Sequence, residues 1–139
     1  MHANRWVVEV DPSPASAAAM EWCATHVGEG GEVIAVGSLT TFQEFVLSVP
    51  PSDLTTWQRD IRYALDHQRT APLRTHGVAY RTRLEEGAPW RTALDVAEAE
   101  RADAIVVGHE SHGLAFGSRD VQRLMDHANV PVIVVPHRS

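Results

Sequence analysis

The segment ADAIVVG, residues 102 to 108, constrains the fold of this chain more than any other stretch. It is a short run rich in apolar residues with almost no polar interruption, as expected for a strand that is covered on both faces. Such strands lie in the middle of parallel sheets, because the crossover helices cover both faces of the sheet. The run therefore predicts an α/β fold built on a parallel sheet.

Strand-like and helix-like segments alternate strictly along the rest of the chain. Five short runs rich in β-branched residues are predicted as strands: 5–11, 31–39, 78–87, 102–108 and 131–137. The helices predicted between them are 14 to about 27, 52 or 53 to about 72, 89 to about 99, and 118–127. This order predicts one open sheet with helices on both faces and right-handed crossovers. The 139 residues contain no repeat or linker, so we expect a single domain over residues 1–139.

Serine, proline and glycine mark the expected ends of the first two helices. Ser13 is interpreted as the N-cap of the first helix, with Pro14 at its first helical position and Gly28 just after its end. Pro72 is expected to end or kink the second helix, because proline in a helix interior removes a hydrogen bond and clashes with the preceding turn.

The last predicted helix begins near Ser118, which is interpreted as its cap. Its residues Val121, Leu124 and Met125 share the face that we expect to turn inward. The third predicted strand places Arg81 and Arg83 on one face, which favours a position near an edge of the sheet.

The charge of the chain excludes several classes of function. Its formal net charge is −6, which disfavours nonspecific binding to nucleic acid or to an anionic membrane. All 12 basic residues are arginines. Because a P-loop needs a lysine at its phosphates, the chain is not a Walker-type nucleotidase, and Schiff-base chemistry on lysine is excluded as well.

The single cysteine, Cys23, allows no intrachain disulfide, and its helix-like surroundings favour a small buried hydrophobic residue. No apolar run reaches the length of a membrane span. Glu9 and Asp11 interrupt the N-terminal segment before it resembles a signal sequence. We therefore expect a cytoplasmic protein.

Three segments carry a resemblance to a known family. The opening VVEVDPSPASAAAMEW, the stretch EEGAPWRTALDVAEAERADAIVVG and the closing GSRDVQRLMDHANVPVIVVP together resemble the universal stress protein family. The resemblance covers nearly the whole chain. It implies a parallel five-stranded sheet of order 3-2-1-4-5, similar to the adenine nucleotide alpha hydrolase-like and Rossmann-like folds. It also implies a homodimer formed by antiparallel pairing of the last strands, which here are Val132, Ile133, Val134 and Val135.

Members of the family that bind ATP carry a glycine-rich loop after the fourth strand, where backbone N–H groups and a helix N-terminus meet the phosphates. Carried over to this sequence, the resemblance places Gly108 at the first glycine, Gly117 and Ser118 at the last pair, and Asp11 near the adenosine. It places Ser38 where a backbone touches adenine. The candidate nucleotide-binding residues are Asp11, Ser13, Ser38, Val107, Gly108, Ser111, Gly117, Ser118 and Arg119.

This loop departs from the pattern of the ATP-binding members. Ser111 replaces the second glycine, and the five residues 112–116 make the loop four residues shorter than the pattern. Glu110 and Asp120 stand where binding members often carry arginine and a hydroxyl residue, and Pro12 replaces a glycine. Two carboxylates near a triphosphate lower its affinity by repulsion, and Asp120 competes with an anion for the helix N-terminus.

Some residues of the loop favour an anion instead. The guanidinium of Arg119 can grip a phosphate, and His109 and His112 can donate to one when protonated. We therefore expect binding of ATP or AMP to be weak or absent, with an adenosine or monophosphate pocket still open at the switch point of the sheet.

The chain offers little support for catalysis or for a metal. His109, Glu110 and His112 lie close in sequence but lack the spacing of a zinc protease, so a solvated loop is the simpler interpretation and no metal is expected. Ser111 and Ser118 lack the sequence context of an activated nucleophile. We expect no enzyme, although weak ATPase or hydrolase activity stays open.

Two functions remain as hypotheses. The first is a regulatory stress-response protein with a degenerate adenine-nucleotide site. The second is a dimeric interaction protein of the same family that binds no nucleotide and acts on an unknown protein partner. Phe42, Phe45 and Leu47 would cover the pocket mouth or a dimer interface. The short acidic loop favours the interaction protein, and the overall resemblance to the family favours the degenerate nucleotide site.

Overall fold

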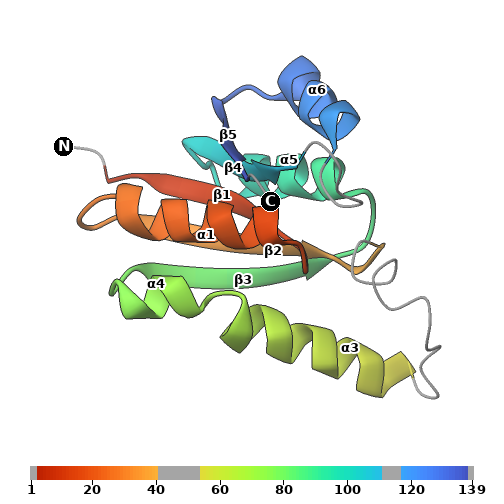
Figure 1. Cartoon of the computed structure of the whole chain (residues 1–139). Coiled ribbons are helices and arrows are strands. Elements are labelled where there is room, and N and C mark those ends of the chain that lie inside the picture. Colours follow the sequence, from red (N-terminus) through yellow and green to blue (C-terminus); the bar gives the residue numbers. More distant parts are fainter. Residues whose placement is uncertain (1–2, 41–53, 111–116, 138–139) are drawn as a thin grey trace.

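The computed structural model describes residues 3–40, 54–110 and 117–137 (Figure 1). Its strands form one parallel sheet in the order β3-β2-β1-β4-β5, which confirms the predicted fold class and strand order. The strands are β1 (Arg5–Val10), β2 (Glu32–Ser38), β3 (Ala79–Glu85), β4 (Ala104–His109) and β5 (Val132–Pro136). The strand order reverses between β1 and β4, so the loops that follow these two strands diverge there.

Helices cover both faces of the sheet. They are α1 (Pro14–His26), α3 (Leu54–Tyr63), α4 (Ala71–Thr75), α5 (Pro89–Ala99) and α6 (Ser118–His127). Figure 1 shows α1 in front of the sheet, while α3 and α4 run along the β3 edge and α5 lies behind. Each face is sealed by its own apolar cluster, one centred on α1 and the other on α5 and α6. The central strands β1 and β4 are therefore buried on both sides, as their apolar sequences predict.

The first helix begins as its sequence predicts. The Ser13 side chain accepts a hydrogen bond from the backbone N–H of Ser16 at 3.1 Å, and Pro14 occupies the first turn. Gly28 follows the helix with a φ of +89°, a conformation that side chains other than glycine seldom adopt. Cys23 is buried inside the cluster under α1, and burial raises the pKa of its thiol to about 12.

Two predictions about helices need correction. Pro72 does not end the second helix, because α3 gives way to a π-helical turn at Ala64–Gln68 and Pro72 lies in the first turn of α4. Met125 of α6 is 59% exposed, while Leu124 is buried and Val121 is partly buried. The inward stripe of α6 is thus narrower than the sequence suggests.

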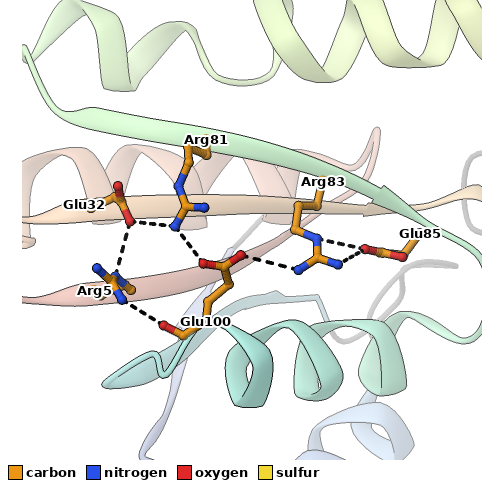
Figure 2. Close-up of polar contacts among 6 residues, drawn as sticks. All are labelled: Arg5, Glu32, Arg81, Arg83, Glu85 and Glu100. Carbon is orange, nitrogen blue, oxygen red and sulfur yellow. Dashed lines mark hydrogen bonds and ion pairs between the residues drawn. The ribbon is translucent and has the colours of Figure 1, made fainter.

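The edge strand β3 carries Arg81 and Arg83 on one face, as predicted, and that face meets the end of α5. Six residues from β1, β2, β3 and the end of α5 form what we call the charged network: Arg5, Glu32, Arg81, Arg83, Glu85 and Glu100 (Figure 2). Arg81 Nη2 lies 3.0 Å from Glu32 Oε1 and 2.7 Å from Glu100 Oε2. Every member has an ion-pair partner of opposite charge, so this surface contributes no net charge.

Within residues 3–40, 54–110 and 117–137, no helix combines the length and the apolar character that a membrane crossing needs.

Candidate functional site

The turn after β1 is fixed by its own side chains. Asp11 is only 1% exposed, and its Oδ1 accepts a hydrogen bond from the backbone N–H of Ser13 at 2.7 Å. The backbone N–H of Asp11 donates to Ser16 Oγ at 3.0 Å. These contacts join Asp11 and Ser13 to the first turn of α1, so both residues keep a fixed position at the carboxyl end of the sheet.

Gly108 lies directly against the start of α1. A Cβ atom at this position would stand 2.1 Å from the carbonyl oxygen of Ala15, far inside van der Waals contact. The missing side chain therefore allows β4 and α1 to touch through their backbones. This contact brings Gly108 beside the turn that contains Asp11 and Ser13.

Ser38 and Val107 lie at the ends of the neighbouring strands. The pairing of β1 with β2 ends at Val10 and Gly37, so Asp11 and Ser38 are the next residues on adjacent strands. The Ser38 hydroxyl donates to the carbonyl oxygen of Gly87, which ties β2 to the turn before α5. The side chain of Val107 is buried in the cluster under α5 and α6, so only its backbone can meet a ligand at this edge.

The start of α6 differs from the sequence prediction. Gly117 has an extended backbone and occupies the N-cap position, so Ser118 is the first helical residue and not the cap. The Asp120 carboxylate accepts a hydrogen bond from the Gly117 N–H at 3.2 Å, as expected if it serves the helix N-terminus. Arg119 is exposed and makes no ion pair with the residues that the structure describes, whereas Ser111 lies outside them.

One residue of the site escapes the sequence analysis. Glu9, on β1, is 1% exposed, and neither of its carboxylate oxygens accepts a hydrogen bond from a donor among the described residues. Burial raises the pKa of Glu9 well above its ordinary value, and the charge of Asp11, a side-chain hydrogen bond with Asp11 and the charge of Asp120 add to this shift. The signal available in the sequence is an acid inside a strand that the strand order places at the centre of the sheet.

We call Glu9, Asp11 and Asp120 the acidic group. It joins the turn after β1 to the start of α6, although the two lie far apart in the sequence. The site thus joins Asp11 to Ser13 by a hydrogen bond and sets Gly108 against Ala15 in the first turn of α1. Ser38 lies one strand away, and Asp120 of α6 acts on Glu9 electrostatically. Three carboxylates gather here, whereas the candidate cation, Arg119, is exposed.

Other features of the described residues do not coincide with this site. A cavity of about 700 Å³ lies between α3 and the end of β3, where Leu39, Arg59, Arg62 and Leu84 line part of it. No three histidine, cysteine or acidic residues in the described ranges are arranged to hold a metal ion. His112, Phe42, Phe45 and Leu47 lie outside those ranges, so the predictions that concern them stay predictions.

The comparison with known proteins decides the family. The model of the universal stress protein family matches residues 3–136 of the chain. The chain belongs to the universal stress protein family. No curated protein matches it in sequence.

Solved universal stress proteins share the fold of this family member at low sequence identity. A universal stress protein from Archaeoglobus fulgidus in complex with dAMP is 20% identical with a TM-score of 0.67, over 97% of this chain and 99% of that one. An Arabidopsis thaliana member with AMP bound is 18% identical with a TM-score of 0.68, over 98% and 93%. A universal stress protein in complex with cAMP is 16% identical with a TM-score of 0.71, over 99% and 100%. Likeness at this level establishes the fold.

Proposed function

We propose that this universal stress protein is a regulatory binding protein with a degenerate adenine-nucleotide site at the carboxyl ends of β1 and β4. The observation that supports this most directly is the contact of Gly108 with α1, which holds the Asp11 turn at the switch point of the sheet. Related structures of the same fold hold AMP, dAMP or cAMP, which all contain adenine and one phosphate.

The acidic group argues against a strong triphosphate site. Asp11 and Asp120 both lie close enough to Glu9 to act on it electrostatically, and their charges add repulsion toward an anion bound beside the start of α6. The helix N-terminus that would attract a phosphate is already served by Asp120. We therefore propose that adenosine and AMP are the better ligands and that ATP binds no more tightly than AMP.

Binding is also the proposed task, in preference to turnover. Ser13 caps α1 and Ser118 lies exposed in the first turn of α6, so neither serine has the setting of an activated nucleophile. The site has no proposed metal. We also propose a cytoplasmic location, since the lone buried thiol of Cys23 requires no oxidising compartment.

Calorimetric titration of the nucleotide-free protein tests this function. Adenosine and AMP are expected to bind with dissociation constants of about 10–100 µM, and ATP, with or without magnesium, no more tightly. Asp11→Asn is expected to weaken adenosine binding about tenfold, because it removes the charge next to the proposed nucleoside. Asp95→Asn is the matched control, since Asp95 lies on the exposed side of α5 and pairs with Arg91. Absence of binding by all three ligands would contradict the proposal.

A second function is favoured by the position of β5 at an edge of the sheet. This strand is the last in the sheet, its residue Val134 is 37% exposed, and Met125 of the adjacent α6 is exposed as well. We propose that Val132, Ile133, Val134 and Val135 pair with a second copy of the chain, because an exposed apolar edge strand is a template for pairing. Sedimentation of Val134→Glu is expected to give the monomer mass, while Tyr63→Glu, an exposed residue of α3, leaves the dimer intact.

A further inference from the structure

Glu9 is a buried acid whose carboxylate oxygens accept no hydrogen bond from a donor in the part of the chain that the structure describes. Its side-chain hydrogen bond is with another acid, Asp11, and needs a proton on one of the two carboxyl groups. It stands two positions after Val7 on β1, so it faces the same side of the sheet, toward α5 and α6. The pairing of β1 with β2 sets Glu9 beside Val36. Native proteins seldom leave a buried carboxyl unsatisfied, so a group of this kind calls for a functional reason.

The groups that face Glu9 from the surrounding elements are acidic or uncharged, with one histidine. Asp11 from the end of β1 and Asp120 from α6 both act on it electrostatically. His109, on the neighbouring strand β4, has a buried Nδ1 that has no partner among the described residues. The inward side of α5 carries only uncharged residues: Thr92, Ala93, Leu94, Val96 and Ala97. No arginine neutralises Glu9 within the described ranges.

This setting couples the charge of Glu9 to the charge of any ligand. An uncharged nucleoside adds no charge, so its binding does not depend on whether Glu9 holds a proton. A phosphate adds at least one negative charge beside the acidic group, and that charge favours the protonated form of Glu9. Since burial and its two acidic neighbours already raise the pKa of Glu9, the proton is available well above the range of an exposed glutamate.

We propose that Glu9 sets the ligand class of the site: a phosphorylated adenine ligand binds together with a proton on Glu9, whereas adenosine binds without one. The inference rests on the proposed nucleotide site and adds its specificity and its dependence on pH. The proton comes from solvent and stays on the Glu9 carboxyl while the phosphate is bound. Above the pKa of Glu9 in the free protein, the affinity for AMP falls by up to about tenfold per pH unit.

The test is a calorimetric titration with AMP and with adenosine between about pH 5.5 and about pH 8.5, in pairs of buffers with different ionisation enthalpies. The buffer pairs count the protons taken up on the wild-type chain itself, so this readout does not depend on how a variant folds. We expect uptake approaching one proton per AMP at the upper end of the range and none with adenosine. We also expect AMP affinity to fall at least about tenfold across the range, with adenosine changing less than about threefold.

Three variants separate Glu9 from other titrating groups. Glu9→Gln keeps His109 and the ligand phosphate, which itself titrates at about pH 6, so the difference from wild type isolates Glu9. AMP binding by Glu9→Gln is expected to lose the part of the pH dependence that proton uptake on Glu9 causes. His109→Gln is expected to keep that part, and Glu98→Gln, on the exposed side of α5, is the matched control.

The outcomes distinguish this inference from the function on which it rests. If AMP binds with the same pH dependence and proton count in wild type and Glu9→Gln, the inference is overturned and the nucleotide site stands. If neither adenosine nor AMP binds at any pH, the nucleotide site itself is wrong and the role of Glu9 falls with it.

Discussion

The charged network and the acidic group place the same residue type in opposite surroundings. In the network, Glu100 lies between Arg81 and Arg83, and its pKa is lowered mainly by the hydrogen bond from Arg81 (Figure 2). In the acidic group, no residue that the structure describes places a cation beside Glu9, and burial raises its pKa. A carboxylate therefore stabilises this fold at its surface and destabilises it at the carboxyl end of the sheet.

The difference is consistent with the proposed position of the site. Paired charges on an outer face need no explanation beyond solubility and the protection of an edge strand. Buried acids without a neutralising cation lower the free energy of unfolding, because their desolvation is not offset. The carboxyl end of β1 is thus the place where this chain departs from local stability, as expected for a binding site.

The largest expected effect comes from the backbone contact that holds the acidic group next to β4. Gly108→Ala is expected to destabilise the fold by about 3 kcal/mol or more, because the new Cβ meets the Ala15 carbonyl. Chemical denaturation measures the change. Gly117→Ala is the matched control, since no atom lies within 4 Å of a Cβ placed there and its φ is −87°. Equal stability of the two variants would refute this view of Gly108.

Removal of the buried charge is expected to have the next largest effect, with the opposite sign. Glu9→Met replaces a buried carboxyl that accepts no hydrogen bond within the described residues by an apolar side chain of similar size. It is expected to stabilise the fold by about 1–3 kcal/mol near neutral pH. Glu98→Met on exposed α5 surface is the control and should change stability little. A loss of stability in Glu9→Met, measured by urea denaturation, would mean that Glu9 has a partner that stabilises its charged form.

The two glutamates should also differ in the direction of their pH dependence. Because the folded pKa of Glu9 is raised, its stabilising contribution is complete below the unfolded pKa and is lost as pH rises through the folded one. The folded pKa of Glu100 is lowered, so its contribution is present above the unfolded pKa and is lost as pH falls through the folded one. The measurement is the free energy of unfolding against pH for wild type and the two variants. Glu9→Gln should lose the fall in stability at the high-pH side, and Glu100→Gln should lose the fall at the low-pH side. Parallel curves would count against the contrast.

The smallest effect is expected within the charged network. A double-mutant cycle with Arg81→Met and Glu100→Gln is expected to give a coupling of about 0.5–1 kcal/mol, because the pair is partly exposed. Added salt should reduce the coupling, whereas the effect of Glu9→Met should change little, since buried groups are screened less. Coupling that persists in high salt would mean that the network is shielded from solvent.

The sheet was predictable because its signals are local and redundant. Each strand is a short β-branched run, and α1 has both its Ser13 cap and its Gly28 end, so propensity and pattern agree. The position of β3 at an edge follows from the charge of its outer face. These features depend on neighbouring residues along the chain.

The sequence predictions fail where contacts between residues far apart in the chain determine the structure. Met125 has the spacing of an inward residue, but α6 contacts the sheet over too narrow a stripe to cover it. Ser118 has good cap chemistry, yet Gly117 and Asp120 take that task together. In the sequence, Glu9 looks like an ordinary polar residue of a strand. Its burial is evident only in the folded chain, where β2, β4, α5 and α6 surround it.

The fit of Gly108 against α1 has a consequence for how sequences of this kind are interpreted. The glycine that opens the nucleotide loop of the family is required here by the packing of a helix on a strand. Selection for a folded protein would keep it through generations in which no nucleotide binds. A glycine at this position is therefore evidence of helix packing and not of a bound nucleotide. Gly117 and Arg119 are not needed for packing, so their retention among related sequences would be the better evidence of a ligand.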